Sequence, residues 1–267
     1  NGIQNKTAQR KKLHIPYTGA GPQCLIHCYD KSLVKDRAKD MEIPVPETIL
    51  IEPDDVIFNL PFIFPVLVKP NFADASFGIT KGSVANNSEE LTRAISEIRK
   101  IGYDKLIIAE EFLSGKDISV GIIGNPPDSY MVLPITEEDY STLPSGLPKI
   151  CGYEAKWDQS SPYWNIKSIQ AKLSEGTERV IINYCLKLFE RLECRDYARF
   201  DWRLDSKGNP KLLEVNPNPG WCWDGHLAKM SKISGLSYTV MLGSILQAAE
   251  QRLNINKKEE IIAIDSP

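Results

Sequence analysis

Two pairs of β-forming runs, each pair separated by a short turn sequence, restrict the fold of this chain more than any other feature. Residues 117–124 and 130–135 flank a Pro-Pro-Asp turn, and residues 197–204 and 211–216 flank the polar turn DSKGNP. Runs joined by such short turns pair as antiparallel hairpins. Because helical segments lie between the hairpins, we expect an α+β fold with antiparallel sheets rather than a doubly wound parallel α/β sheet.

The remaining segments show helix and strand patterns of ordinary length. The clearest helix is capped by Ser88 with Glu89 and Glu90 and ends at Gly102. Its apolar face consists of Leu91, Ile95, Ile98 and Ile101. We expect further helices at 30–41, 174–192 and 236–253, and strands at 65–70, 82–85 and 106–110. We expect a short strand or turn at 15–19, loops at 71–81 and 137–165, and polar ends at 1–12 and 256–267.

Length and charge restrict the class of protein. A chain of 267 residues holds one large domain or two modest ones. Its 42% hydrophobic and 25% charged residues exclude a disordered, collagen-like or coiled-coil chain. The 32 Lys and Arg residues balance 35 Asp and Glu residues, so no basic excess favours a nucleic-acid partner.

Neither a membrane span nor a cysteine framework is expected. The longest uncharged stretch, 233–249, is too polar and too short to cross a bilayer, and no leader segment opens the chain. The six cysteines form no CxxC pair and only three histidines accompany them, which disfavours a zinc site or disulfides. We therefore expect free thiols in a reducing cytoplasm.

The second hairpin brings together the side chains most suited to chemistry. If its turn centres on Lys207 and Gly208, Asp201 lies opposite Glu214 and Arg199 lies opposite Asn216. Alternation along the strands places these four side chains on one face. The opposite face is then apolar and consists of Phe200, Trp202, Leu213 and Val215.

Two carboxylates and an amide oxygen suit Mg²⁺, which completes its coordination with water and substrate phosphates. The neighbouring Arg199 would neutralise oxygens of a transferring phosphoryl group. The spacing alone fits a solvated hairpin face with a cross-strand ion pair equally well. No GxGxxG and no GxxxxGK[ST] sequence is present, which argues against a Rossmann or P-loop protein.

Several short motifs occur in order along the chain: IPYTGAG at 15–21, DKSLVKD at 30–36, FPVLVKP at 64–70, IAEEFLSGKDISVGIIG at 108–124, YEAKW at 153–157, RFDWRLD at 199–205 and KLLEVNPNPG at 211–220. This ordered set resembles the ATP-grasp superfamily, and specifically its D-alanine–D-alanine ligase branch. The resemblance implies two α+β lobes with antiparallel sheets that clasp ATP. It assigns residues 29–116 to a small central lobe, 117–255 to a C-terminal lobe and 256–267 to a tail, while 1–28 match only the end of a preceding α/β domain that is largely missing.

The resemblance also implies a role for each matched residue. Lys35, Lys69 and Lys156 would contact nucleotide phosphates, covered by a loop that contains Ser76. Glu110, Glu111 and Leu113 would read adenine, and Asp117 would bind the ribose. Arg199 and the backbone N–H of Gly220 would stabilise the tetrahedral intermediate. Asp201, Glu214 and Asn216 would hold Mg²⁺, two ions in this family, with Mn²⁺ as an alternative.

The sequence departs from the family where the second substrate binds. The family joins its closing loop to its phosphate loop through a Tyr–Ser pair, and Trp157 and Ala75 stand here instead, so we expect that polar latch to be absent. The residues matching the acceptor pocket are Trp221, Trp223, Gly225 and His226, with Cys222 beside them.

These observations lead to one hypothesis and two alternatives. The chain is expected to be an ATP- and Mg²⁺-dependent ligase that joins an amino-acid carboxylate to an amine through an acylphosphate. One alternative is a ligase for substrates other than D-alanine, and the other is a nucleotide-binding protein without ligase turnover. The expected partners are amino-acid-like small molecules, with a homodimer left open.

Overall fold

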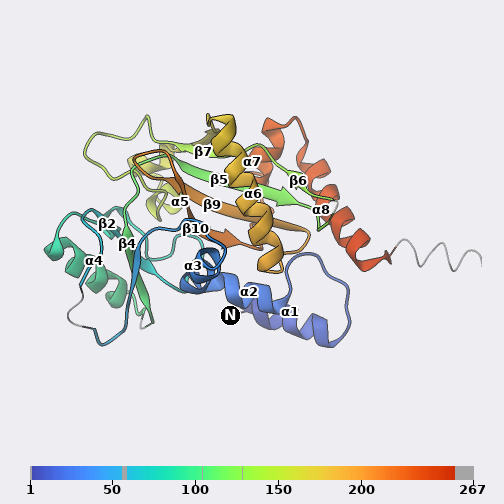
Figure 1. Cartoon of the computed structure of the whole chain (residues 1–267), viewed down its shortest axis with the longest axis horizontal. Helices are drawn as coiled ribbons and strands as arrows, with labels where there is room; N and C mark the ends of the chain where they lie inside the picture. Colours follow the sequence, from blue (N-terminus) through green and yellow to red (C-terminus); the bar gives the residue numbers. More distant parts are fainter. Residues whose placement is uncertain (1, 56–58, 104, 128, 256–267) are drawn as a thin grey trace, which may run out of the picture.

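The computed structural model describes residues 2–55, 59–103, 105–127 and 129–255. Within them the chain forms two antiparallel sheets (Figure 1). The smaller sheet has the order β1-β4-β2-β3 and contains β1 (Thr48–Ile51), β2 (Val66–Pro70), β3 (Val84–Ala85) and β4 (Ile107–Glu111). The larger sheet has the order β10-β9-β5-β7-β8, with β6 beside β5, and contains β5 (Asp117–Ile123), β6 (Met131–Val132), β7 (Thr136–Asp139), β8 (Lys167–Gln170), β9 (Tyr197–Leu204) and β10 (Pro210–Asn216). The expected α+β fold with antiparallel sheets is confirmed.

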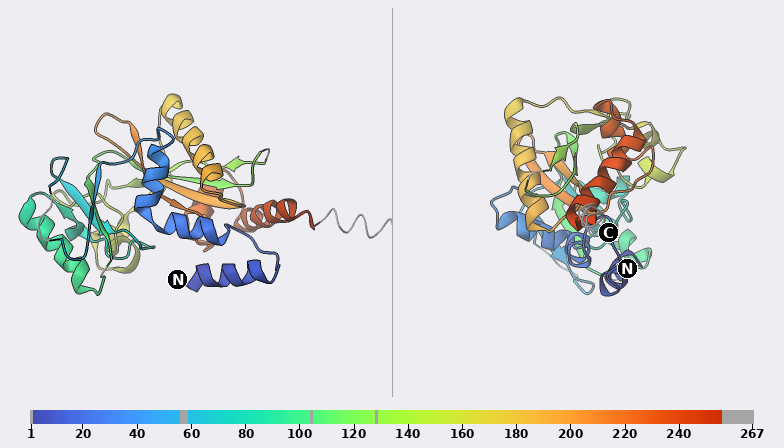
Figure 2. Two further views of the ribbon diagram at one scale, coloured as in Figure 1. Left: turned by 60° about the horizontal axis from the view of Figure 1, so that its bottom comes forward. Right: turned by 90° about the vertical axis from the view of Figure 1, so that its right-hand side faces the viewer.

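Helices cover both sheets. They are α1 (Gly2–Lys12), α2 (Pro22–Tyr29), α3 (Lys31–Lys39), α4 (Ser88–Lys100), α5 (Glu154–Trp157), α6 (Glu175–Arg191), α7 (His226–Ile233) and α8 (Tyr238–Leu253), with 3₁₀ turns at Lys81–Ser83 and Pro162–Asn165. Figure 2 shows α1 lying alongside α2 at the edge of the molecule. In the described ranges no helix is both long enough and apolar enough to cross a membrane.

Helix α4 packs on the smaller sheet. Its buried residues Leu91 and Ile98 share a core with Val66 and Val68 of β2. The expected stop at Gly102 is confirmed, because this residue adopts a φ of +79° that favours glycine. The expected face was partly wrong, since Ile101 follows the helix and is 53% exposed.

The cap of α4 also differs from the expectation. Asn87 is the N-cap, and its side-chain oxygen accepts a hydrogen bond from the backbone N–H of Glu90 at 2.9 Å, whereas Ser88 is the first helical residue. We therefore expect Asn87→Ala to lower the free energy of unfolding by about 1 kcal/mol, measured by urea denaturation. Ser88→Ala is the matched control and should change it by less than about 0.5 kcal/mol. A larger loss for Ser88→Ala than for Asn87→Ala would contradict this cap.

The larger sheet has a different core on each face. On one face, Val120 and Ile122 of β5 pack with Phe200 and Trp202 of β9 in a core that also receives side chains of α2, α3 and α6. On the other face α7 and α8 pack against β5 and the start of β9. Gly121 permits this close approach, because a Cβ there would lie 2.8 Å from Leu227. Helix α3 thus joins the core of the larger sheet, although it precedes the smaller sheet in the chain.

Several elements were missed where the sequence lacks a periodic signal. Helix α1 has no apolar face, α5 is a single turn, and the strands β7 and β8 are short and rich in charged or polar residues. Helices α2 and α7 and strand β1 were also not expected. Residues 15–19 form no strand: they are irregular with a bend at 18–19, and the Gly19 N–H donates a 2.8 Å hydrogen bond to the buried Asp196. Residue 1, residue 128 of the expected Pro-Pro-Asp turn and the tail 256–267 lie outside the described residues.

Candidate functional site

Two adjoining cavities lie between the smaller sheet and the hairpin of β9 and β10. Their volumes are about 370 and 130 Å³. They share six lining residues, which are Lys31, Ser76, Ile79, Lys156, Arg199 and Glu214. The hairpin face singled out in the sequence is therefore a wall of these cavities rather than an open solvated surface.

The register of the hairpin is as expected at the polar end and shifts beyond it. Glu214 pairs with Asp201 and Asn216 with Arg199, but Leu212 pairs with Trp202, so a β-bulge falls at Leu213. A bulge inserts one extra residue and reverses the side-chain alternation beyond it. The expectation that Leu213 belongs to the apolar face was therefore wrong: Leu212 is fully buried there, and Leu213 lines the smaller cavity.

Asp201 is held in place by two neighbours. Its Oδ1 accepts hydrogen bonds from Ser119 Oγ at 2.7 Å and from Arg199 Nε at 2.8 Å, while Arg199 Nη2 donates to Oδ2 at 2.7 Å. Burial raises the pKa of the Asp201 carboxyl, but the guanidinium and the hydroxyl more than offset it, so the pKa falls to about 2. Asp201 is therefore an anion at neutral pH.

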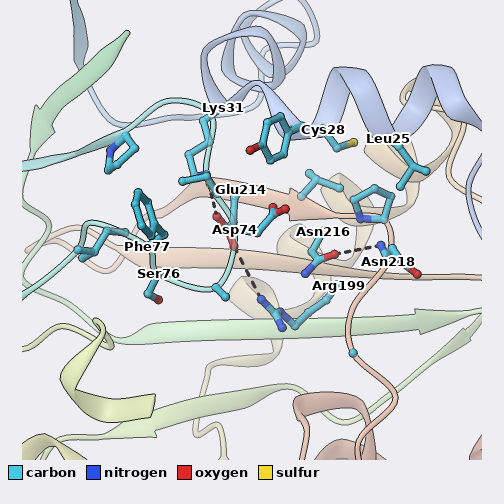
Figure 3. Close-up of a pocket in the computed structure, with 18 of the residues that line it drawn as sticks. Leu25, Cys28, Lys31, Asp74, Ser76, Phe77, Arg199, Glu214, Asn216 and Asn218 are labelled. Carbon is cyan, nitrogen blue, oxygen red and sulfur yellow. Dashed lines mark hydrogen bonds and ion pairs between the residues drawn. The ribbon is translucent and has the colours of Figure 1, made fainter. Parts of the chain in front are cut away.

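Glu214 and Asn216 present oxygens to the larger cavity (Figure 3). The Glu214 carboxylate lies 3.8 Å from Arg199 Nη2 and 3.8 Å from Lys31 Nζ, which is beyond hydrogen-bond distance. The Asn216 Oδ1 accepts a 3.0 Å hydrogen bond from the Asn218 N–H. Glu214 thus keeps its oxygens available to a ligand between two cations.

The donor set at this wall fits a hard divalent cation. In the described part of the chain no three His, Cys, Asp or Glu side chains are arranged to hold a metal ion. The candidate ligands Asp201, Glu214 and Asn216 are two carboxylates and one amide oxygen. Such a set suits Mg²⁺, which usually takes one or two carboxylates and leaves the remaining positions to water and phosphates.

The lysines are arranged differently from the expectation. Lys69 lines the smaller cavity, and its Nζ lies 2.6 Å from Glu110 Oε1. Lys35 is buried away from both cavities, hydrogen-bonded to Glu110 and, at 2.9 Å, to Thr48 Oγ1. Because its ammonium is enclosed by protein, Lys35 is not placed to contact a phosphate.

Lys31 is the cation that the sequence analysis missed. It is the first residue of α3, its ammonium hydrogen-bonds the Ala73 carbonyl oxygen, and it lines both cavities. Lys31 and Lys35 are one helical turn apart in the same motif, so the sequence presents two equivalent lysines. The sequence alone does not distinguish Lys31, beside the loop that contains Ser76, from Lys35 inside the core.

The remaining residues expected to contact the nucleotide occupy varied environments. Asp117 lines the smaller cavity and accepts a 2.7 Å hydrogen bond from the Tyr140 hydroxyl. The Glu110 side chain is turned into the protein toward Lys35 and Lys69, and Leu113 is buried. Glu111 pairs with Lys211 of β10, outside both cavities. Of these four, only Asp117 has a side chain on a cavity wall.

A polar latch joins the phosphate loop to the segment that contains α5. Lys156 Nζ donates to Ser76 Oγ at 2.8 Å, and Ser76 Oγ donates to the Cys151 carbonyl oxygen at 3.1 Å. The Tyr153 N–H donates to the Ile79 carbonyl oxygen at 2.7 Å. Trp157 and Ala75 stand where the family has its Tyr–Ser pair, and Ser76, Lys156 and Tyr153 supply a polar connection between the two segments.

We expect Ser76→Ala to weaken this latch. Loss of one partly buried hydrogen bond costs about 1 kcal/mol, so the Tyr153 amide should exchange its hydrogen about fivefold faster. Hydrogen exchange followed by NMR measures this. Ser160→Ala is the control, because the Ser160 hydroxyl bonds Asp158 outside the latch and its loss should leave the Tyr153 exchange unchanged. Equal exchange rates in wild type and Ser76→Ala would show that Ser76 does not hold the segments together.

The acceptor-pocket residues divide into two groups. Gly220 lines the larger cavity, and His226 lines the smaller one with Nδ1 3.8 Å from Glu138 Oε1. Burial and the neighbouring Arg199 lower the pKa of His226 to about 3, so it is neutral at pH 7. Trp221 packs on Tyr197 and Trp223 is 77% exposed, and neither lines the two cavities. The remaining two, Gly225 and the exposed Cys222, also lie outside these walls.

The sequence of this chain is similar to a known protein family and to several known proteins. Residues 39–247 match the family model described as "D-ala D-ala ligase C-terminus". The chain is 30% identical over 240 residues to the uncharacterized protein y4sG of Sinorhizobium fredii (89% of this chain, 67% of that protein). It is 29% identical over 238 residues to the vancomycin B-type resistance protein VanB of Enterococcus faecalis (89% and 66%). It is 30% identical over 234 residues to a D-alanine–D-alanine ligase of Halalkalibacterium halodurans (86% and 72%).

A solved structure shows the same fold. The D-alanine–D-alanine ligase from Bacillus anthracis complexed with ATP superposes with a TM-score of 0.71 at 22% identity, covering 94% of this chain and 74% of that chain. The chain spans about two thirds of the length of the curated relatives it matches, 67% for the y4sG protein and 66% for VanB.

Proposed function

Because this chain belongs to the D-alanine–D-alanine ligase C-terminal family, we propose that it carries the ATP-binding and catalytic part of a carboxylate–amine ligase. The reaction runs through an acylphosphate. A substrate carboxylate attacks the γ-phosphorus of ATP and ADP leaves; an amine then attacks the acyl carbon and phosphate leaves.

The observation that carries this proposal is the convergence of charges on one cavity. Lys31, Lys69 and Arg199 line the smaller cavity together with Asp201 and Glu214. Phosphoryl transfer depends on positioning the reacting groups and on neutralising the phosphate oxygens, and the protein itself takes part in little covalent chemistry. With Lys156, Arg203, Asp117 and Glu138 on the same wall, five cationic side chains beside four carboxylates provide such an environment for the triphosphate of a nucleotide.

Asp201, Glu214 and Asn216 would hold Mg²⁺, which would neutralise phosphate oxygens and orient the triphosphate when bound. We propose two ions, as in the family, with Mn²⁺ as an alternative. Lys31 and Lys69 would contact phosphate oxygens directly, with Lys69 oriented by Glu110. Asp117, on the wall of the smaller cavity, would bind the ribose, and Glu111 and Leu113 would contact adenine through their backbone groups.

The larger cavity would hold the amino-acid substrate. Arg199 and Gly220 both line it, and the guanidinium of Arg199 and the backbone N–H of Gly220 would stabilise the tetrahedral intermediate. The latch of Lys156 and Ser76 covers this side, and it would keep water from the acylphosphate. His226 would contact the acceptor from the adjoining cavity as a neutral hydrogen-bonding group.

We propose amino-acid-like small molecules as substrates, without assigning D-alanine to either position. The apolar pair Trp157 and Ala75 supports a ligase with substrates other than two D-alanines. A homodimer and the lack of a nucleic-acid partner remain predictions of the sequence analysis, as do contacts of Trp221, Trp223 and Gly225 with substrate.

ADP release from the full chain tests this proposal. ATP and Mg²⁺ are incubated with amino acids, singly and in pairs, and the binding of ATP is measured separately by calorimetry. We expect ATP to bind and ADP release to depend on the amino acids present. Binding of ATP without ADP release for any pair would favour the alternative of a nucleotide-binding protein, and failure to bind ATP would contradict both.

A further inference from the structure

Three buried thiols meet behind the wall of the larger cavity. Cys24 and Cys28 lie one turn apart on α2, and Cys194 lies between α6 and β9. The Cys24 Sγ is 3.9 Å from the Cys28 Sγ and 3.9 Å from the Cys194 Sγ. Their exposed fractions are 1%, 7% and 4% for Cys24, Cys28 and Cys194. All are free thiols, so the cluster contains three reduced sulfurs around Cys24.

Geometry disfavours one of the possible disulfides. A disulfide requires a sulfur separation of about 2.05 Å and Cβ atoms about 3.5–4.5 Å apart. Residues one turn apart on a helix have Cβ atoms about 5–6 Å apart, so a bond between Cys24 and Cys28 would distort α2. Cys194 lies outside α2, so a bond between Cys24 and Cys194 would not join two positions of the same helix.

The cluster is within reach of small molecules in the cavity. Cys28 lines the larger cavity together with Leu25 (Figure 3), and Tyr29 is also part of this wall. The Cys28 sulfur on this wall lies 3.9 Å from the Cys24 sulfur, so Cys28 connects the cavity wall to the cluster. Hydrogen bonding with the Cys194 and Cys28 thiols lowers the pKa of Cys24 to about 5, and a thiolate is the form that attacks an oxidant.

We propose that Cys24, Cys28 and Cys194 form an oxidation site in which a hydroperoxide entering through the cavity converts Cys24 and Cys194 into a disulfide. The Cys24 sulfur attacks one peroxide oxygen, the O–O bond breaks, and Cys24 becomes a sulfenic acid while the leaving oxygen takes a proton. The Cys194 sulfur then attacks the Cys24 sulfur, the S–O bond breaks, and water leaves. Overall, two thiols and one hydroperoxide give one disulfide, one alcohol (water for hydrogen peroxide) and one water.

The disulfide would act on the cavity through α2. The two sulfurs must approach by almost 2 Å from their 3.9 Å separation. Leu25, Cys28 and Tyr29 of the same helix line the larger cavity, and Lys31 follows directly at the start of α3. Oxidation therefore changes the shape of the ligand cavity. This inference does not depend on the ligase assignment.

Peptide mapping of the wild-type chain tests the proposal directly. The chain is treated with hydrogen peroxide, its free thiols are blocked, and it is digested with trypsin without reductant. Cleavage after Lys12, Lys31, Arg191 and Arg195 releases peptides 13–31 and 192–195. We expect these two peptides to be joined, the bond to map to Cys24 by fragmentation, and the free-thiol count to fall from six to four. Dithiothreitol should restore all six.

Two variants sharpen the test. Cys194→Ser should lose the joined peptide, whereas Cys222→Ser, which removes an exposed thiol, should keep it. Both are compared with wild type by thermal unfolding in the reduced state to verify the fold. The proposal is overturned if Cys24 and Cys194 stay reduced while Cys222 is oxidised, or if they oxidise only to sulfinic acids without a bond between them.

Discussion

Glu214→Gln is expected to release ADP at least about 10-fold more slowly than wild type under saturating substrates. The substitution keeps the shape of the side chain and removes the negative charge that would attract a divalent cation. Loss of even an outer-shell partner costs about 10–100-fold in metal affinity or activity, so loss of a carboxylate ligand should cost no less. Since Glu214 is 36% exposed and its ion pairs are 3.8 Å long, the fold should be preserved.

The measurement is ADP release as a function of Mg²⁺ concentration, together with thermal unfolding of both proteins. Glu97→Gln on the exposed surface of α4 is the matched control, because Glu97 pairs only with Lys100 far from the cavities, and its activity should equal that of wild type. ADP release within threefold of wild type for Glu214→Gln would remove Glu214 from the metal site.

Glu110→Gln is expected to lower the free energy of unfolding by about 3–5 kcal/mol at pH 7. Glu110 is 1% exposed and forms ion pairs with Lys35 and Lys69, which are themselves buried. Removing one partner of a buried ion pair leaves the opposite charge buried without a counter-charge, and this typically costs about 3–5 kcal/mol. Urea denaturation measures the loss, and Glu97→Gln, which breaks an exposed pair, should cost less than about 1 kcal/mol. A loss below 1 kcal/mol for Glu110→Gln would contradict the role of this buried pair.

The same carboxyl should make stability depend on acidic pH. Burial alone raises the pKa of Glu110, but the two ammonium groups more than offset it and hold the pKa at about 2, below its ordinary value of 4.5. As the pH falls, Glu110 is therefore protonated in the unfolded chain at a higher pH than in the folded chain. The stabilisation that its charge provides is complete above about pH 4.5 and is lost as the pH falls toward 2. The shift corresponds to about 3 kcal/mol. Stability measured from pH 6 to 3 should fall less steeply in Glu110→Gln than in wild type.

The pairing at the polar end of the β9–β10 hairpin could be predicted from the sequence, because strand alternation and a short turn determine the register. The pairing of Asp201 with Glu214 is confirmed. The bulge at Leu213 was not predictable, since nothing in the run KLLEVN distinguishes a regular strand from one with an extra residue. It moves a leucine from the core to the cavity wall, which is a change in the site rather than in the fold.

Other parts of the site depend on tertiary contacts that leave no local pattern. Lys31 and Lys35 are equivalent in sequence, and only the packing of α3 on β10 decides which of them faces the cavity. The latch joins Ser76 and Lys156, which are 80 residues apart. The thiol cluster joins Cys24 and Cys194 across 170 residues, and scattered cysteines in a sequence do not reveal such a cluster.

Trapping the acyl intermediate with hydroxylamine tests the central claim most directly. The full chain is incubated with ATP, Mg²⁺, hydroxylamine and one amino acid at a time, and nucleotides and hydroxamates are quantified. Activation of a carboxylate as an acylphosphate predicts equal amounts of ADP, phosphate and the amino-acid hydroxamate for at least one amino acid. Formation of AMP and pyrophosphate, or the lack of any hydroxamate from a chain that binds ATP, would contradict the proposed reaction.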